Sequence, residues 1–230
     1  MEVFARKKRS DDPAKRRSKA IKKFRYYFPR GFDDKKYIAW ERDYKWNAHL
    51  QWNDKLNRNE FAKLLSLRKY EEIAKQVVNI ESKTNLLFSF EKMAFRDAVK
   101  SPSSARIFAE ALFDYLYGKE KMESRFTAFR DVLASLPVKQ TRVLTWPLIT
   151  VLGFIADPVH HIFLKPVVTK KAAEKYQFEF SYQSKPNWKT YQSLLDFAEQ
   201  IRKDTGAMHP KDMIDLQSFI WVTGSEEYPD

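Results

Sequence analysis

"TWPLITVLGFIADP", residues 145–158, is the most hydrophobic stretch of the chain and the one around which the fold is expected to form. It predicts a central helix that ends before Asp157-Pro158, because proline disfavours the α conformation in the residue that precedes it. The longest apolar run, Thr145 to Ala156, falls far short of the roughly 20 residues that a membrane-spanning helix needs. We therefore expect no membrane partner.

Helix start and stop signals recur on both sides of this stretch. Ser101-Pro102 opens a segment that closes at Gly118, and Asp12-Pro13 opens another. The five glycines of the chain are few for a sheet-rich protein with many tight turns. These patterns predict a mainly α protein, a single multi-helix globular domain of about nine helices.

Two segments after the central helix are expected to be irregular or short. Residues 159–168 predict a loop or extended chain, followed by a short helix that Thr169 caps. "FEFSY", residues 178–182, alternates as a strand does. We therefore expect at most one short strand pair.

Composition restricts the class of protein. With 230 residues, of which 43% are hydrophobic and 15% aromatic, the chain is able to bury a sizeable core. It has no cysteine, which excludes disulfides, thiolate chemistry and cysteine zinc sites and fits a reducing compartment. No apolar segment follows the basic N-terminus, so a signal peptide is not expected. We expect a soluble cytoplasmic protein.

The net charge of +12 is concentrated at the N-terminal end. Residues 1–30 contain twelve Lys/Arg and three Asp/Glu, whereas the other 200 residues contain 30 basic and 27 acidic side chains. The expected division is therefore a basic N-terminal arm and helix over 1–30 and an α-helical globular domain over 31–230.

The arm contains an amphipathic basic helix that is expected to run from Asp12-Pro13 to about Phe28. Phe24 and Phe28 are expected to face the body of the protein. The opposite face is basic, and it consists of Lys15, Lys19, Lys22 and Arg25.

Clustered Lys and Arg side chains neutralise phosphates and release counterions from nucleic acid. The arm therefore predicts nucleic acid, DNA or RNA, as partner. The side chains expected to bind it are Lys7, Lys8, Arg9, Arg16, Arg17, Lys19, Lys22 and Lys23. A solvated tail and a tail that docks on an acidic protein remain open as alternatives.

The helix expected over residues 35–56 contains two further patterns. Trp40, Trp46 and Trp52 are either core residues or platforms on which bases stack. Glu41, Lys45 and His49 share a face. They form either ordinary contacts between residues four apart or an acid–base row that binds phosphate.

An enzyme acting on nucleic acid or on a phosphorylated substrate is an alternative. Its pocket would lie between the central and the final helix, and its candidate catalytic residues are Arg142, His160, His161, Lys165 and Asp215. Adjacent histidines seldom bind one metal together, because they point to opposite sides of an extended chain. No glycine-rich phosphate loop and no metalloprotease motif is present. We expect neither a metal nor a cofactor.

The final helix, within residues 209–224, contains three polar residues that need partners if they are buried. Asp212 is expected to cap the start of that helix. Asp215 is expected to form a salt bridge with Arg96 or Arg142, and Gln217 needs a partner of its own.

The leading hypothesis is an intracellular nucleic-acid-binding protein whose basic arm contacts phosphates and whose helical body provides a surface. The second hypothesis is the enzyme described above, and the sequence leaves open whether any catalytic activity exists. The third is a protein-interaction subunit of a larger assembly that exposes aromatic patches.

Overall fold

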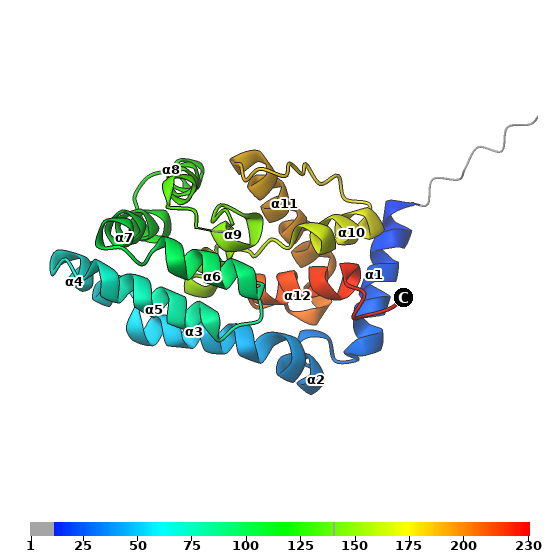
Figure 1. The fold of residues 1–230 in the computed structure, drawn as a ribbon. Coiled ribbons are helices and arrows are strands. Elements are labelled where there is room, and N and C mark those ends of the chain that lie inside the picture. Colours follow the sequence, from blue (N-terminus) through cyan, green and yellow to red (C-terminus); the bar gives the residue numbers. More distant parts are fainter. Residues whose placement is uncertain (1–11, 140) are drawn as a thin grey trace, which may run out of the picture.

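Helix α9 (Trp146–Ala156) lies at the centre of the fold, as its composition predicted, and all of its residues are buried. The computed structural model describes residues 12–139 and 141–230. The helices that pack most closely against α9, at the centre of Figure 1, are α3 (Asp43–Lys55), α5 (Tyr70–Ser82), α7 (Pro102–Tyr117) and α8 (Met122–Ser135). A helix that is apolar on every side is stable in water only when it is enclosed in this way.

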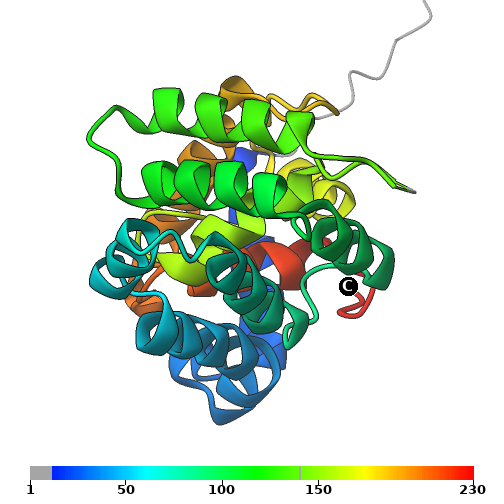
Figure 2. The ribbon, with the colours of Figure 1, turned by 60° about the vertical axis from the view of Figure 1, so that its left-hand side comes forward.

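One side of the molecule is built around α5. Helices α4 (Arg58–Ser66), α6 (Ser89–Ala98) and α7 pack against α5. Helices α7 and α8 lie side by side in Figure 2 and form the outer layer of this half.

The other side is built around α12 (Met213–Gly224). Helix α10 (Pro166–Tyr176) packs along α12, helix α11 (Trp188–Asp204) contacts it, and α1 (Pro13–Tyr27) contacts both α10 and α12. Residues 225–230 return from α12 towards α1 (Figure 1). Two short 3-10 helices, η1 (Gly31–Asp33) and η3 (Gly206–Met208), contact each other beside this group.

Helix α1 is part of the packed body. Asp12 caps it by accepting a hydrogen bond from the Ala14 N–H, and Pro13 occupies the first turn, as predicted. Phe24 and Phe28 are fully buried, and their rings contact those of Phe32 and Tyr37, among others. The apolar face of α1 therefore belongs to the core of the domain.

The helix after α1 contains a turn that the sequence did not reveal. Helix α2 (Lys35–Tyr37) continues through a π-helical turn, η2 (Ile38–Arg42), into α3. The Asp43 N–H bonds to the Ile38 carbonyl, five residues earlier, instead of four. Within this turn two consecutive charged residues, Glu41 and Arg42, are both buried. π turns of this kind are rare and are often found at functional sites.

The mainly helical class is confirmed, but the number of helices differs from the prediction. The described residues form eleven α-helices of nine residues or more, not about nine helices, and they contain no strand. Residues 178–182 form irregular chain in which the Tyr182 N–H bonds to the Phe180 carbonyl, and beside them the Ser181 N–H bonds to the Ser193 hydroxyl of α11 and the Gln183 N–H to the Thr190 hydroxyl of α11. Side chains of a helix therefore satisfy this backbone in place of a second strand.

Helix α10 begins earlier than predicted. Pro166 occupies its first turn, since proline is favoured there, and Thr169 is a buried residue inside the helix. Thr169 is thus not the cap. None of the helices in the described ranges is both long and apolar enough to cross a membrane.

Candidate nucleic-acid interface

The outer face of α1 is a row of basic side chains. The helix contains seven Lys or Arg residues and no acidic residue. Lys15, Lys19, Lys22 and Tyr26, which we call the α1 ridge, are all exposed. Because they are spaced by four, three and four residues, they lie along one line of the helix. Among residues 12–139 and 141–230, no carboxylate pairs with any of the three lysines.

An aromatic ring ends this row. Tyr26 is 79% exposed, and its ring contacts the ring of Tyr27 edge-on, with centroids 5.2 Å apart. An exposed ring beside lysines is the arrangement on which single-stranded nucleic acids stack their bases.

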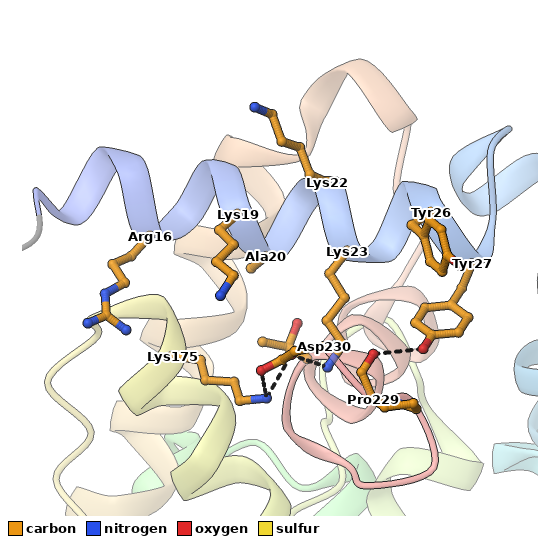
Figure 3. Close-up of a pocket in the computed structure, with 11 residues that line it drawn as sticks. Arg16, Lys19, Ala20, Lys22, Lys23, Tyr26, Tyr27, Lys175, Pro229 and Asp230 are labelled. Carbon is orange, nitrogen blue, oxygen red and sulfur yellow. Dashed lines mark hydrogen bonds and ion pairs between the residues drawn. The ribbon is translucent and has the colours of Figure 1, made fainter.

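A hollow of about 770 Å³ runs along the ridge (Figure 3), and we call it the α1 groove. Helix α1 forms one wall, Lys175 of α10 contributes to the opposite wall, and residues 229–230 close the floor. Its lining from α1 includes Lys19, Lys22, Lys23, Tyr26 and Tyr27. Three separate segments of the sequence thus build one basic groove.

The carboxylate of Asp230 lies between two lysines of the groove (Figure 3). The Lys23 Nζ donates to its Oδ1 at 2.7 Å, and the Lys175 Nζ donates to its Oδ1 and Oδ2 at 2.9 and 2.8 Å. The hydrogen bonds from Lys175 and Lys23 lower the pKa of Asp230 to about 2. Burial lowers the pKa of Lys23 and outweighs the opposing effect of Asp230. The Tyr27 hydroxyl holds the same segment by donating to the Pro229 carbonyl at 2.7 Å.

The predicted nucleic-acid-binding residues differ in their surroundings. Lys19 and Lys22 are exposed, whereas Lys23 is paired with Asp230. Arg17 lies 3.7 Å from Asp204 and stacks over the Tyr176 ring at 5.8 Å. Arg16 is half-buried at the edge of the groove. The other three, Lys7, Lys8 and Arg9, lie outside the described residues.

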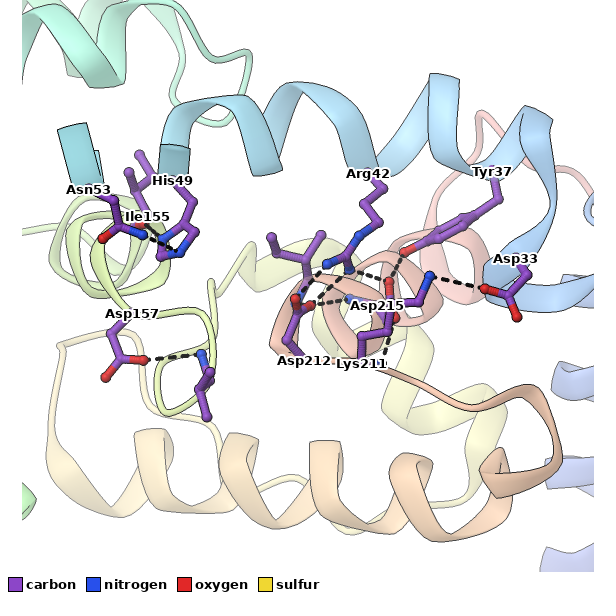
Figure 4. Close-up of polar contacts among 12 residues, drawn as sticks. Asp33, Tyr37, Arg42, His49, Asn53, Ile155, Asp157, Lys211, Asp212 and Asp215 are labelled. Atoms are coloured by element: carbon purple, nitrogen blue, oxygen red, sulfur yellow. Dashed lines mark hydrogen bonds and ion pairs between the residues drawn. The ribbon is translucent and has the colours of Figure 1, made fainter. Parts of the chain in front are cut away.

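Asp215 belongs to a buried ionic cluster that joins η2 to the start of α12 (Figure 4). Arg42 donates to Asp212 at 2.6 and 3.0 Å and to Asp215 at 2.6 Å. The Tyr37 hydroxyl donates to the same Asp215 oxygen at 2.6 Å. Burial raises the pKa of Asp215, and it would lower that of Arg42, but the two carboxylates raise the pKa of Arg42 instead.

The predicted partner of Asp215 was wrong. Arg96 is exposed and lies 3.6 Å from Asp97, and Arg142 is an exposed residue of the segment before α9. Asp212 does cap α12, because it accepts from the N–H groups of Ile214 and Asp215. The Gln217 Oε1, in contrast, is buried without a hydrogen-bond partner among the described residues.

Lys45 and Glu41 form a second buried pair next to this cluster. Their side chains are 3.2 Å apart, the Lys45 Nζ also donates to Ser218 at 2.8 Å, and Tyr228 donates to Glu41 at 2.6 Å. Burial lowers the pKa of Lys45. His49 bonds separately to the Ile155 carbonyl at 2.9 Å (Figure 4). The row Glu41–Lys45–His49 therefore makes internal contacts and presents no shared surface to a ligand.

The remaining catalytic candidates His160, His161 and Lys165 each have partners of their own. His160 is exposed and bonds to Asp157 at 2.8 Å. His161 is buried 3.0 Å from the Tyr115 hydroxyl, and its burial lowers its pKa to about 4. Lys165 donates to the Leu86 carbonyl at 3.1 Å. Arg142 is on the surface and Asp215 is in the ionic cluster, so no hydrogen bond or ion pair joins any two of the five candidates among the described residues.

The three tryptophans also lie in different environments. Trp52 is buried, and Trp46 is half-buried with its ring against His49. Trp40 is 57% exposed, with the Lys36 ammonium 4.3 Å from its ring centroid. Of the three, Trp40 is the ring available for stacking. The described part of the chain contains no group of three His, Cys, Asp or Glu side chains arranged to hold a metal ion.

Sequence reasoning missed the residues that complete the groove. Lys175 lies in α10 and Asp230 follows α12, and neither position carries a motif that would connect it to α1. Tyr26 was detectable, because it continues the spacing of Lys15, Lys19 and Lys22. No protein-family model, curated protein or solved structure matches this chain.

Proposed function

We propose that this protein binds nucleic acid along the α1 ridge and groove. The observation that supports it most directly is the line of three exposed lysines, Lys15, Lys19 and Lys22, which have no acidic partner among the described residues and adjoin a basic groove. Lysines with no internal partner are available to neutralise phosphates, and the counterions they release favour binding.

The dimensions of the ridge suit a nucleic-acid strand. A helix rises about 1.5 Å per residue, so Lys15 and Lys22 are roughly 10 Å apart along the axis. Phosphates of one strand follow each other at about 3.4 Å along a duplex axis. The ridge therefore spans about three nucleotides, and Tyr26 adds a stacking surface at its end.

The test compares two triple variants of equal charge in a salt-titrated binding assay. The probes are fluorescently labelled 20-nucleotide single-stranded DNA, single-stranded RNA and duplex DNA, followed by anisotropy. The first variant replaces Lys15, Lys19 and Lys22 with glutamine. The control replaces the exposed lysines of α3, α5 and the segment before α7, which are Lys55, Lys75 and Lys100.

Loss of three phosphate contacts should reduce the slope of log affinity against log salt by about 2–3 for the ridge variant. Its affinity at low salt should fall by at least about tenfold, and the control should keep the slope of the wild type. Equal slopes in all three proteins would refute the proposal. Deleting residues 1–30 is unsuitable as a test, because it would also remove the buried Phe24 and Phe28.

A second candidate function is protein binding through α6. Phe88, the N-cap residue of α6, and Phe90 within α6 are 53% and 55% exposed, their rings stack at 5.6 Å, and Met93 of α6 is exposed as well. Exposed aromatic patches often mark protein interfaces. If copies of this chain assemble there, sedimentation velocity should show concentration-dependent association that Phe88→Ser and Phe90→Ser together abolish. A wild type that stays monomeric at high concentration would argue against self-assembly.

A further inference from the structure

The carboxylate of Asp230 lies in the α1 groove between Lys23 and Lys175. Its two carboxylate oxygens receive hydrogen bonds from Lys23 and Lys175 at 2.7–2.9 Å, which is the usual distance for a charge-assisted bond to an anion. Among the described residues that line the groove, Asp230 is the sole carboxylate. The remaining titratable side chains of the lining are lysines, an arginine and tyrosines.

The ion pairs of Asp230 are open to solvent. The Asp230 side chain is 46% exposed, and ion pairs that reach solvent contribute little to stability. A carboxylate and a phosphodiester each carry one negative charge and offer oxygen acceptors, so one replaces the other without leaving a lysine unpaired.

The exchange requires Asp230 to move while Tyr228 stays in place. Tyr228 is buried, and its hydroxyl is bonded to Glu41, so the chain is anchored just before the groove. Beyond this anchor the described contacts are the Tyr27 hydrogen bond to the Pro229 carbonyl and the two lysine contacts of Asp230. Rotation about the backbone of residues 229–230 would vacate the space between the lysines.

We propose that Lys23 and Lys175 form a phosphodiester subsite of the α1 groove and that Asp230 fills this subsite in the free protein, so that a nucleic-acid strand binds by displacing it. This inference rests on the proposed nucleic-acid binding. It adds a residue of α10 to the interface, and it makes residues 229–230 an internal competitor of the ligand.

The experiment uses Asp230→Asn with Glu226→Gln as its matched control. Glu226 belongs to the same segment and pairs with Lys171 at 2.6 Å, but it lies outside the lining of the α1 groove. Both variants remove one carboxylate that pairs with a lysine, so a general change in net charge affects them equally. Binding is measured with the labelled single-stranded 20-nucleotide DNA over a range of salt concentrations, and unfolding midpoints verify that both variants are folded.

Asp230→Asn should bind about two- to fivefold more tightly than Glu226→Gln, the range that follows from removing one competing exposed ion pair. The gain should disappear when Lys175→Gln is combined with Asp230→Asn, because the subsite then lacks one of its two cations. Equal affinities of Asp230→Asn and Glu226→Gln would overturn the proposal, and so would a gain that persists without Lys175.

The outcomes separate this inference from the proposed function. If the ridge variant weakens binding while Asp230→Asn behaves as Glu226→Gln does, nucleic-acid binding stands and the internal competitor is refuted. If neither the wild type nor Asp230→Asn binds any probe, both proposals fail together. If Asp230→Asn binds more tightly while the ridge variant binds as the wild type does, the subsite stands and the ridge is refuted.

Discussion

Replacing Arg42 with methionine is expected to destabilise the fold by about 3–5 kcal/mol, the usual cost of removing one partner from a buried ion pair. The Arg42, Asp212 and Asp215 side chains are 10%, 7% and 0% exposed. Three hydrogen bonds of 2.6–3.0 Å join the guanidinium to the two carboxylates. Methionine fills similar space but leaves both carboxylates without their cation.

The loss should depend on pH in a defined direction. Burial already raises the pKa of Asp215 in the wild type, and removing Arg42 takes away the main effect that opposes it. When the folded pKa of an acid lies above its unfolded value, the folded state binds more protons and stability falls as the pH rises. The variant should therefore be weakest near neutral pH and approach the wild type as Asp215 is protonated on acidification.

The assay is urea unfolding followed by tryptophan fluorescence at pH 5 and pH 7, together with thermal unfolding. For a chain of this size, 3–5 kcal/mol lowers the Tm by roughly 6–20 °C. The control is Arg106→Met, which breaks the exposed Arg106–Glu110 pair and should leave the unfolding midpoint close to that of the wild type. A loss below about 1 kcal/mol at pH 7 would refute the reasoning, because the buried ion pair would then contribute no more than an exposed one. The same loss at both pH values would also refute it, because the loss would then not depend on the ionisation of Asp215.

Two further predictions concern the core. Phe24→Ala should cost about 3–5 kcal/mol of stability, because Phe24 is fully buried on the inner face of α1. The control Tyr26→Ala removes an exposed ring of the same helix and should cost far less in the same urea assay. Equal losses would contradict the packing of α1. Burial lowers the pKa of His161 from 6.5 to about 4. Between these two pH values the unfolded chain binds a proton at His161 that the folded chain does not bind. The free energy of unfolding should therefore fall as the pH drops from 6.5 to 4. Between pH 6.5 and pH 4 the wild type should lose roughly 3 kcal/mol more than His161→Gln, and parallel stability profiles of the two proteins would rule this out.

The helix boundaries were predictable where they depend on neighbouring residues. Asp12-Pro13, Ser101-Pro102 and Asp212 each begin a helix in the structure. A cap bonds to N–H groups two or three residues later, so the short local sequence determines it. Segment 178–182 was predicted less well, because whether an alternating segment pairs with a strand depends on the element that the fold places beside it.

The arginine that pairs with Asp215 in the ionic cluster could not be predicted from the sequence. Arg42 and Asp215 are 173 positions apart, and the sequence offered Arg96 and Arg142 as equally reasonable partners. The π turn over Ile38–Arg42, which buries Arg42, has no signal in the residue pattern. A buried carboxylate requires some partner, but the packing of α12 against η2 selects which one.

Composition and spacing by themselves determined that this protein is helical, that its basic charge is concentrated in residues 1–30, and that one face of α1 is basic. The tertiary structure decided which basic side chains remain available. It pairs Arg17 with Asp204 and Lys23 with Asp230, from positions as far as 207 residues away, and leaves Lys19 and Lys22 exposed. The physical reason is that charge is a property of a residue, whereas the freedom of that charge to bind a ligand depends on every group that folding brings within a few ångströms of it.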